Sequence, residues 1–97
     1  EILTGWEAGA DLIKLFPASV GGPSLVKAIL APLPQVRIVP VGGVNLDTAA
    51  DFIQKGAAAL GVGSSLVNQK LLDEGNLDEL TRRAAAYIQE VRKGRGL

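Results

Sequence analysis

Residues 9–19 read GADLIKLFPAS, and the apolar run within them, Leu12 to Phe16, has the length and composition of a short buried strand. Two similar runs follow at a spacing of roughly 22 to 25 residues, about one strand and helix unit. They are Val36 to Val41, in VRIVPVGGV, and Ala58 to Val62, in AALGVGSS. Apolar strands that alternate with helices are typical of a parallel sheet covered by helices, so the sequence predicts an α/β fold.

Helical patterns lie between these runs. Residues 22–30 begin with Gly-Pro and end before the prolines of APLP, which predicts a helix that stops near Leu30. After the second run, Asn45 is the expected N-cap of a helix over LDTAADFIQK, with Asp47 at its positive end. Gly56 fits as the left-handed residue that ends this helix.

The last predicted helix has the clearest pattern. Asn76 is its expected cap, and the apolar residues of one face recur at helical spacing with charged residues opposite. That face consists of Leu77, Leu80, Ala84, Tyr87, Ile88 and Val91. At the other end of the chain, ILTGWEAG reads as the end of a further helix.

The chain has 97 residues with 47% apolar content, which is enough for one modest core. Three strand and helix units would leave two exposed sheet edges and one unclosed face. We therefore interpret the chain as about half of a (β/α)8 TIM barrel, because such barrels need ~200 residues or more. A small, complete three-layer sandwich is the alternative.

Composition excludes several classes of function. Ten basic residues balance ten acidic ones, and only the tail over residues 92–95 clusters one sign, so we expect no nucleic-acid partner. The sequence contains no Cys and no His, which removes the usual zinc ligands and the commonest general base. No apolar run approaches the ~18 residues of a membrane span, and the first residues lack a signal-peptide pattern. We expect no membrane partner and a cytoplasmic protein.

Lys14 stands in the middle of the first apolar run. Side chains alternate along a strand, so Leu12, Lys14 and Phe16 share one face. If the other face packs under helices, Lys14 points into the barrel, where burial would favour the neutral amine that attacks a carbonyl to form a Schiff base. The alternative is an edge-strand lysine whose stem is buried and whose charge reaches water.

Glycine turns follow the second and third runs. Gly42 and Gly43 would let the backbone approach a phosphate closely, and Gly63 and Ser64 would do the same one unit later. In barrels the loops after the last two strands commonly bind phosphate. The alternative is that these glycines only make tight turns. Neither turn has the G-x-G-x-x-G pattern of a dinucleotide site.

In order along the chain, GADLIKLFPAS, GGPSLVKAI, PQVRIVPVGGVN and GVGSSLV resemble the C-terminal half of the class I aldolases that cleave 2-keto-3-deoxy-6-phosphogluconate (KDPG) and related acids. The resemblance covers nearly the whole chain. It implies that residues 1–97 form the C-terminal half of one aldolase barrel domain, with strands six to eight. It also implies a lyase of carbohydrate metabolism, of the Entner–Doudoroff type, and a homo-oligomer, a trimer in this family.

The resemblance also assigns roles to residues. It matches Lys14 to the lysine that forms a Schiff base with the keto carbon, and it implies neither a metal nor another cofactor. Phe16 and Pro17 match residues at the pyruvate end of the site, and Val41 stands where some members have a threonine that can bind a substrate hydroxyl. The predicted phosphate-binding residues are Gly42, Gly43, Gly63 and Ser64. A valine at position 41 leaves open the galactonate epimer, a broader range of acids or relaxed stereocontrol.

The family's acid/base glutamate and its carboxylate-binding arginine lie in the N-terminal half of the barrel and match nothing in this chain. Glu7 and Asp11 precede Lys14 at the bottom of the unit, so neither takes that role. We expect the 97-residue chain alone to be a poor catalyst. The alternative functions are a non-catalytic half-barrel that binds a phosphorylated small molecule, and a fragment that is only a folding module. A phosphosugar isomerase would need a carboxylate or His at a strand end, and these strands have none.

Overall fold

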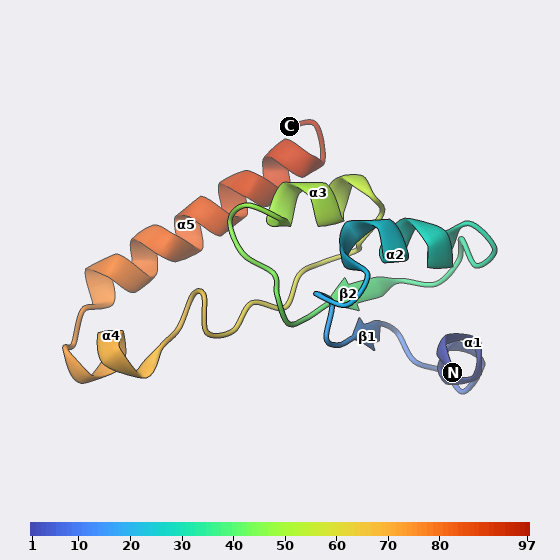
Figure 1. The fold of residues 1–97 in the computed structure, drawn as a ribbon, viewed down its shortest axis with the longest axis horizontal. Helices are drawn as coiled ribbons and strands as arrows, with labels where there is room; N and C mark the ends of the chain where they lie inside the picture. The colour runs from blue at the N-terminus through green and yellow to red at the C-terminus, as the bar shows by residue number, and fades with distance from the viewer.

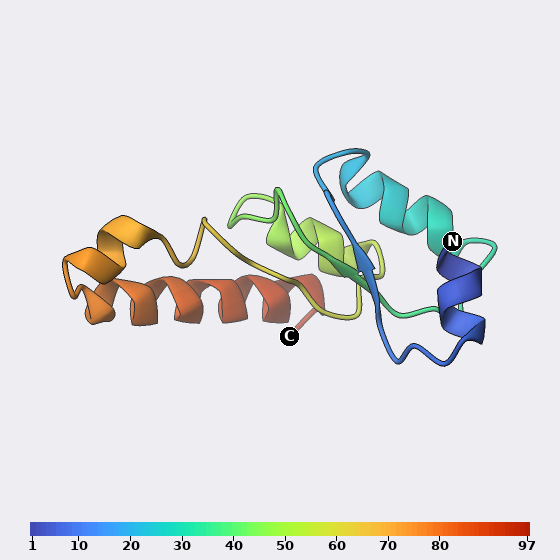
Figure 2. The ribbon, with the colours of Figure 1, turned by 90° about the horizontal axis from the view of Figure 1, so that it is seen from below.

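A computed structural model describes residues 1–97 as two parallel strands with five helices around them (Figure 1). In chain order the elements are α1 (Ile2–Glu7), β1 (Ile13–Leu15), α2 (Gly22–Leu30), β2 (Ile38–Pro40), α3 (Ala49–Gln54), α4 (Gln69–Asp73) and α5 (Leu77–Gly94). The molecule is elongated, 45 × 28 × 22 Å, with α1 and α4 at opposite ends (Figures 1 and 2). The predicted α/β class is confirmed. None of the helices combines the length and the apolar composition needed to cross a bilayer.

The two strands pair in parallel with Lys14 opposite Val39. The third apolar run, Ala58 to Val62, lies along the other side of β2 but does not form the strand predicted for it. It donates two backbone hydrogen bonds of 2.9 Å to β2, from Ala58 to Ile38 and from Gly61 to Pro40, and makes one isolated bridge. These few contacts do not make a continuous ladder with β2, so the run is not a strand.

Most of the predicted helices are present, with two corrections. The helix expected to begin after Asn45 begins at Ala49, because Asn45 closes a separate turn first: its Oδ1 accepts hydrogen bonds from the N–H groups of Asp47 and Thr48. Asp47 therefore lies in that turn and not in α3. The short helix α4 was not predicted, although Asn68 caps it by accepting a hydrogen bond from a backbone N–H.

Other expectations at the helix ends are confirmed. The helix α2 runs over residues 22–30 as predicted, with Pro23 in its first turn. Gly56 follows the end of α3 with a φ of +113°, in the left-handed range expected of it. Asn76 caps α5 by accepting a hydrogen bond of 3.2 Å from the N–H of Glu79.

The core lies between the strands and helices α2 and α3. Its buried members are Ala18, Val26, Val36, Ile38, Val44, Phe52, Ile53 and Ala57. Ile13 and Leu15 of β1 pack against this cluster, whereas Leu12 and Phe16 are 51% and 64% exposed, so the predicted alternation of faces is confirmed. The predicted apolar face of α5 is only partly covered: Tyr87 is buried, and Ile88 is 60% exposed.

Candidate functional site

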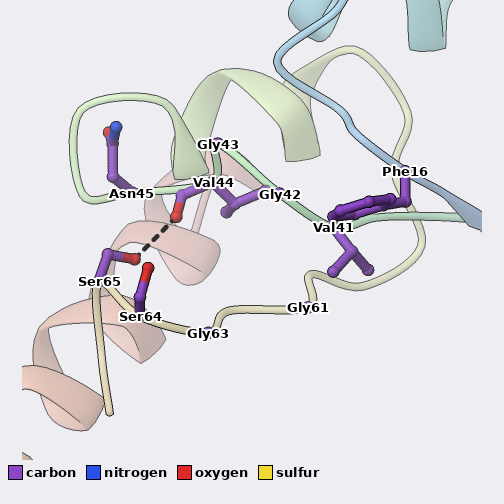
Figure 3. A pocket seen from close by; sticks show the side chains of 10 residues that line it. All are labelled: Phe16, Val41, Gly42, Gly43, Val44, Asn45, Gly61, Gly63, Ser64 and Ser65. Atoms are coloured by element: carbon purple, nitrogen blue, oxygen red, sulfur yellow. Dashed lines mark hydrogen bonds between the residues drawn. The ribbon is translucent and has the colours of Figure 1, made fainter. Parts of the chain in front are cut away.

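A cavity of about 310 Å³ lies at the carboxyl ends of β2 and of the third apolar run (Figure 3). Figure 3 shows Phe16 beside Val41 at one end of it and Asn45 with two serines at the other. Its lining residues are Phe16, Val41, Gly42, Gly43, Val44, Asn45, Gly61, Gly63, Ser64 and Ser65. The two predicted glycine turns therefore meet in one pocket. Of the predicted site residues, only Lys14 and Pro17 do not line it.

The glycine pair after β2 is required by the backbone and by packing. Gly42 and Gly43 have φ values of +87° and +79°, which residues with a Cβ rarely adopt. A Cβ on Gly42 would lie 2.8 Å from the ring of Phe16, and one on Gly43 would lie 2.6 Å from the Cβ of Ser19. Ser19 is held there because its N–H donates a 3.0 Å hydrogen bond to Gly42. The tight-turn explanation therefore holds for this pair.

The second turn is different. Gly63 has no positive φ, and a Cβ there would meet no atom within 4 Å. Neither the backbone conformation nor packing within the chain requires a glycine at this position. A ligand that approaches the backbone closely would require one.

Several backbone N–H groups at the pocket have no acceptor within the chain. They belong to Gly42, Gly43, Val44, Gly63, Ser64 and Ser65, whereas that of Asn45 donates to Thr48 Oγ1 at 3.0 Å. Val44 is only 4% exposed, and buried N–H groups are rarely left without a partner. Unpaired N–H groups on two neighbouring turns are suited to bind an anion such as phosphate. The adjacent helices α3 and α4 are short, with six and five residues. The suitability for an anion therefore depends on the N–H groups of the loops and not on a helix N-terminus.

Lys14 lies outside the pocket but near it. Its side chain is exposed, as in the edge-strand alternative, and the burial expected inside a barrel is not provided by this chain. The Nζ atom lies 5.3 Å from the centroid of the Phe16 ring, and Phe16 also lines the pocket. No strand pairs with the outer edge of β1, so water reaches the amine freely. Pro17 follows Phe16 through a cis peptide bond, and its Cα would lie 3.4 Å from a Cβ on Gly42.

Four residues that line the pocket were not predicted as site residues from the sequence: Val44, Asn45, Gly61 and Ser65. Ser65 donates a 2.9 Å hydrogen bond to the carbonyl of Val44, and Tyr87 donates a 2.8 Å hydrogen bond to Ser65. In the sequence, the serine pair and the glycine pair beside Val44 already indicated a turn that could bind a ligand. Nothing in the sequence linked Tyr87 to these turns. Nowhere does the chain gather three side chains of the types that ligate metals.

The fold and site define an α/β protein with a lysine on a strand and, at the strand ends, a pocket lined by unpaired N–H groups. Over residues 1–83 the sequence matches the model of the family described as "Aldolase: KDPG and KHG aldolase". The chain belongs to the KDPG and KHG aldolase family.

Individual relatives support the same family. The chain is 35% identical over 94 residues to the 2-dehydro-3-deoxy-6-phosphogalactonate aldolase of Escherichia coli K12, covering 96% of this chain and 44% of the relative. It is 33% identical over 97 residues to the 2-dehydro-3-deoxy-phosphogluconate aldolase of Pseudomonas aeruginosa, with the same coverage. A solved structure described as "Native KDPGal structure" superposes with a TM-score of 0.86 at 33% identity, covering 98% of this chain and 45% of that one. The chain thus spans less than half the length of these relatives.

Proposed function

We propose that this chain carries the Schiff-base lysine and the phosphate pocket of a class I aldolase that cleaves KDPG or a closely related 2-keto-3-deoxy sugar acid. The observation that carries this proposal is the pocket in which two turns present unpaired N–H groups, one strand away from Lys14. Membership of the aldolase family supports the reaction class. The names of the relatives support a phosphorylated sugar acid as substrate.

We further propose that the chain is the part of a (β/α)8 barrel that contains strands six to eight. Two open apolar grooves support this. One, of about 640 Å³, runs along the outer edge of β1, and the other, of about 310 Å³, lies between the third apolar run and α5. In a closed barrel both edges would be paired with strands, which removes exposed edges altogether.

The chemistry proposed for Lys14 needs no metal. Its neutral Nζ attacks the keto carbon of the substrate, and loss of water leaves an imine, which is protonated. The C3–C4 bond then breaks: its electron pair moves into the protonated imine to form an enamine, and the C4 hydroxyl loses its proton to become the aldehyde. The enamine takes up a proton at C3, and water releases pyruvate and regenerates the amine of Lys14. In the KDPG case the aldehyde is glyceraldehyde 3-phosphate.

The pocket is proposed to bind the phosphate at the far end of the substrate. Gly43, Gly63 and Ser64 offer backbone N–H groups, and the Ser64 hydroxyl, which makes no hydrogen bond within the chain, adds a donor. Phe16, which contacts both Lys14 and the pocket, would separate the reacting carbons from the phosphate. Val41 lines the same pocket, and its side chain packs on Gly61: a Cβ on that glycine would lie 2.5 Å from it. Its apolar surface would contact the substrate without accepting or donating a hydrogen bond.

A second function remains a candidate for the chain on its own. The phosphate pocket is formed entirely by residues of this chain, whereas Lys14 is exposed and no strand covers the outer edge of β1. A module that binds a phosphorylated small molecule without cleaving it therefore fits the isolated chain. Association into a homo-oligomer, a trimer by resemblance to the family, stays a prediction.

Imine trapping separates these functions. The chain is incubated with pyruvate, reduced with borohydride and analysed by intact mass and peptide mapping. We expect one reduced pyruvate on Lys14, and no adduct in Lys14→Ala. The matched control is Lys27→Ala, since Lys27 is an exposed lysine of α2, and this variant should be labelled like the unaltered chain. Unmodified chain, or labelling that persists in Lys14→Ala, would contradict the Schiff-base role.

A further inference from the structure

A chain of two hydrogen bonds connects α5 to the pocket. The hydroxyl of Tyr87 donates to Ser65 Oγ at 2.8 Å, and Ser65 Oγ donates to the carbonyl of Val44 at 2.9 Å. Figure 3 shows the second of these bonds bridging the two turns. A serine hydroxyl has one proton to donate, and here that proton goes to Val44 while the lone pair accepts from Tyr87. The two bonds therefore have one consistent direction and strengthen each other.

This hydrogen-bond chain links three segments that are far apart in sequence. Ser65 and Val44 are 21 residues apart, and Tyr87 is a further 22 residues along. Val44 and Tyr87 are 4% and 6% exposed, so both ends are held in the protein interior. Ser65 alone joins the turn after β2 to the turn that carries Gly63, and no other side-chain hydrogen bond does so.

The helix that carries Tyr87 is itself anchored. At Gly94 the backbone of α5 lies directly against α3, because a Cβ there would be 2.6 Å from the carbonyl oxygen of Ala50 and 2.8 Å from the Cβ of Ile53. The helix α3 follows the first glycine turn, with only the Asn45 turn between them. Tyr87 is therefore fixed relative to one turn through the helix packing and reaches the other turn through Ser65.

The bond to Val44 also orients the backbone beside the pocket. The Val44 carbonyl is bound to Ser65, and the N–H of the same peptide group, that of Asn45, donates to Thr48 Oγ1 at 3.0 Å. Because a peptide group is planar, holding both its carbonyl and its N–H fixes its orientation. The unpaired N–H of Val44 belongs to the preceding peptide group, so its direction depends on this restraint.

We propose that Tyr87, acting through Ser65, is a positioning residue that holds the two turns at the separation and orientation needed to bind a phosphate group. Neither side chain has to touch the ligand. The inference rests on the proposed phosphate pocket, and it adds Tyr87, a residue to which no motif in the chain pointed. Its physical basis is preorganisation: donors that are already aimed cost less to order when an anion binds.

The test measures binding of inorganic phosphate to the 97-residue chain, followed by the amide signals of Gly43, Gly63 and Ser64 in NMR titrations. Tyr87→Phe removes only the hydroxyl, and we expect the dissociation constant to rise about three- to tenfold, the range that one neutral hydrogen bond corresponds to. Thr81→Val is the matched control, because Thr81 is an exposed hydroxyl residue of α5 that makes no side-chain hydrogen bond. It should bind phosphate like the unaltered chain.

Ser65 variants complete the test. Ser65→Ala should weaken binding by a similar factor, and the double variant should be no weaker than either single one, because both remove the same restraint. Ser65→Thr keeps the hydroxyl and should restore binding, which a merely stabilising role would not predict. Since Ser65 is exposed, its variants carry the test if Tyr87→Phe unfolds the chain.

The outcomes separate this inference from the proposed function. Phosphate binding that is unchanged in Tyr87→Phe and Ser65→Ala would overturn the positioning role and leave the pocket in place. Additive losses in the double variant would overturn it as well. An unaltered chain that shows no phosphate-dependent shifts would overturn the phosphate pocket and this inference together, whereas imine trapping at Lys14 would still test the aldolase chemistry independently.

Discussion

The glycines of the two turns should respond differently to the same substitution, because only one turn is constrained by the fold. Gly43→Ala places a Cβ at a φ of +79°, which costs about 1–2 kcal/mol for a residue with a side chain. The same Cβ would lie 2.6, 3.1 and 3.3 Å from the Cβ, Cα and N atoms of Ser19. Since two of these atoms are backbone, no rotamer change relieves the contact, and overpacking of this kind costs about 1–3 kcal/mol.

The sum for Gly43→Ala is a loss of about 2–5 kcal/mol in the free energy of unfolding. Gly63→Ala has an ordinary φ and no neighbour within 4 Å, so we expect a change of less than about 0.5 kcal/mol. Gly42→Ala should be intermediate: its φ is +87°, but the atoms it would meet first belong to the side chain of Phe16, which is 64% exposed and can move.

Urea unfolding of the 97-residue chain, followed by the fluorescence of its single tryptophan, Trp6, and by circular dichroism, measures these differences. We expect Gly43→Ala to lose most or all of its folded baseline, and Gly63→Ala to unfold at the midpoint of the unaltered chain. The phosphate titration should then show weaker binding in Gly63→Ala despite its unchanged stability, because its Cβ enters the space of the ligand. Equal destabilisation by Gly43→Ala and Gly63→Ala would refute the assignment of one turn to the fold and the other to the ligand.

Four further substitutions test the packing and capping that support the site. Phe52→Ala should destabilise the chain by about 3–5 kcal/mol in urea unfolding because Phe52 is 1% exposed, and the exposed Phe16→Ala should cost far less. Asn76→Ala removes the cap of α5 and should cost about 1 kcal/mol, with increased hydrogen exchange in the first turn of that helix. Gly94→Ala drives a Cβ to 2.6 Å from the Ala50 carbonyl oxygen and should separate α5 from α3, costing about 1–3 kcal/mol; an unchanged unfolding midpoint would show that the two helices adjust freely.

Much of the fold could be predicted because its signals are local. The strand around Lys14, the Gly-Pro start of α2 and the Asn76 cap each depend on residues within one turn or one strand. The predictions that failed depend on competition between neighbours. Asn45 has the right side chain for an N-cap, but its own Asx turn uses that side chain first and delays α3 to Ala49. The third apolar run has strand composition, yet it makes only two backbone hydrogen bonds to β2 and one isolated bridge, which is too few for a continuous ladder.

The candidate site could likewise be predicted only in part. The order of the motifs pointed to Lys14 and to the glycine turns, and the structure brings both turns into one pocket. The structure also distinguishes Gly43, which the backbone requires, from Gly63, which it does not. The exposure of Lys14 could not be read from its strand, because exposure depends on what packs against the outer edge of β1.

The sequence by itself determined the α/β class, the family and the side of the strand on which Lys14 lies, because periodicity, turn chemistry and motif order are properties of neighbouring residues. Only the tertiary structure decided which donors are left unpaired at the pocket and that Tyr87, through Ser65, reaches the carbonyl of Val44. Hydrogen bonds between residues 21 and 22 positions apart exist only after the helices have packed, because the packing of α5 against α3 sets the distance that they span.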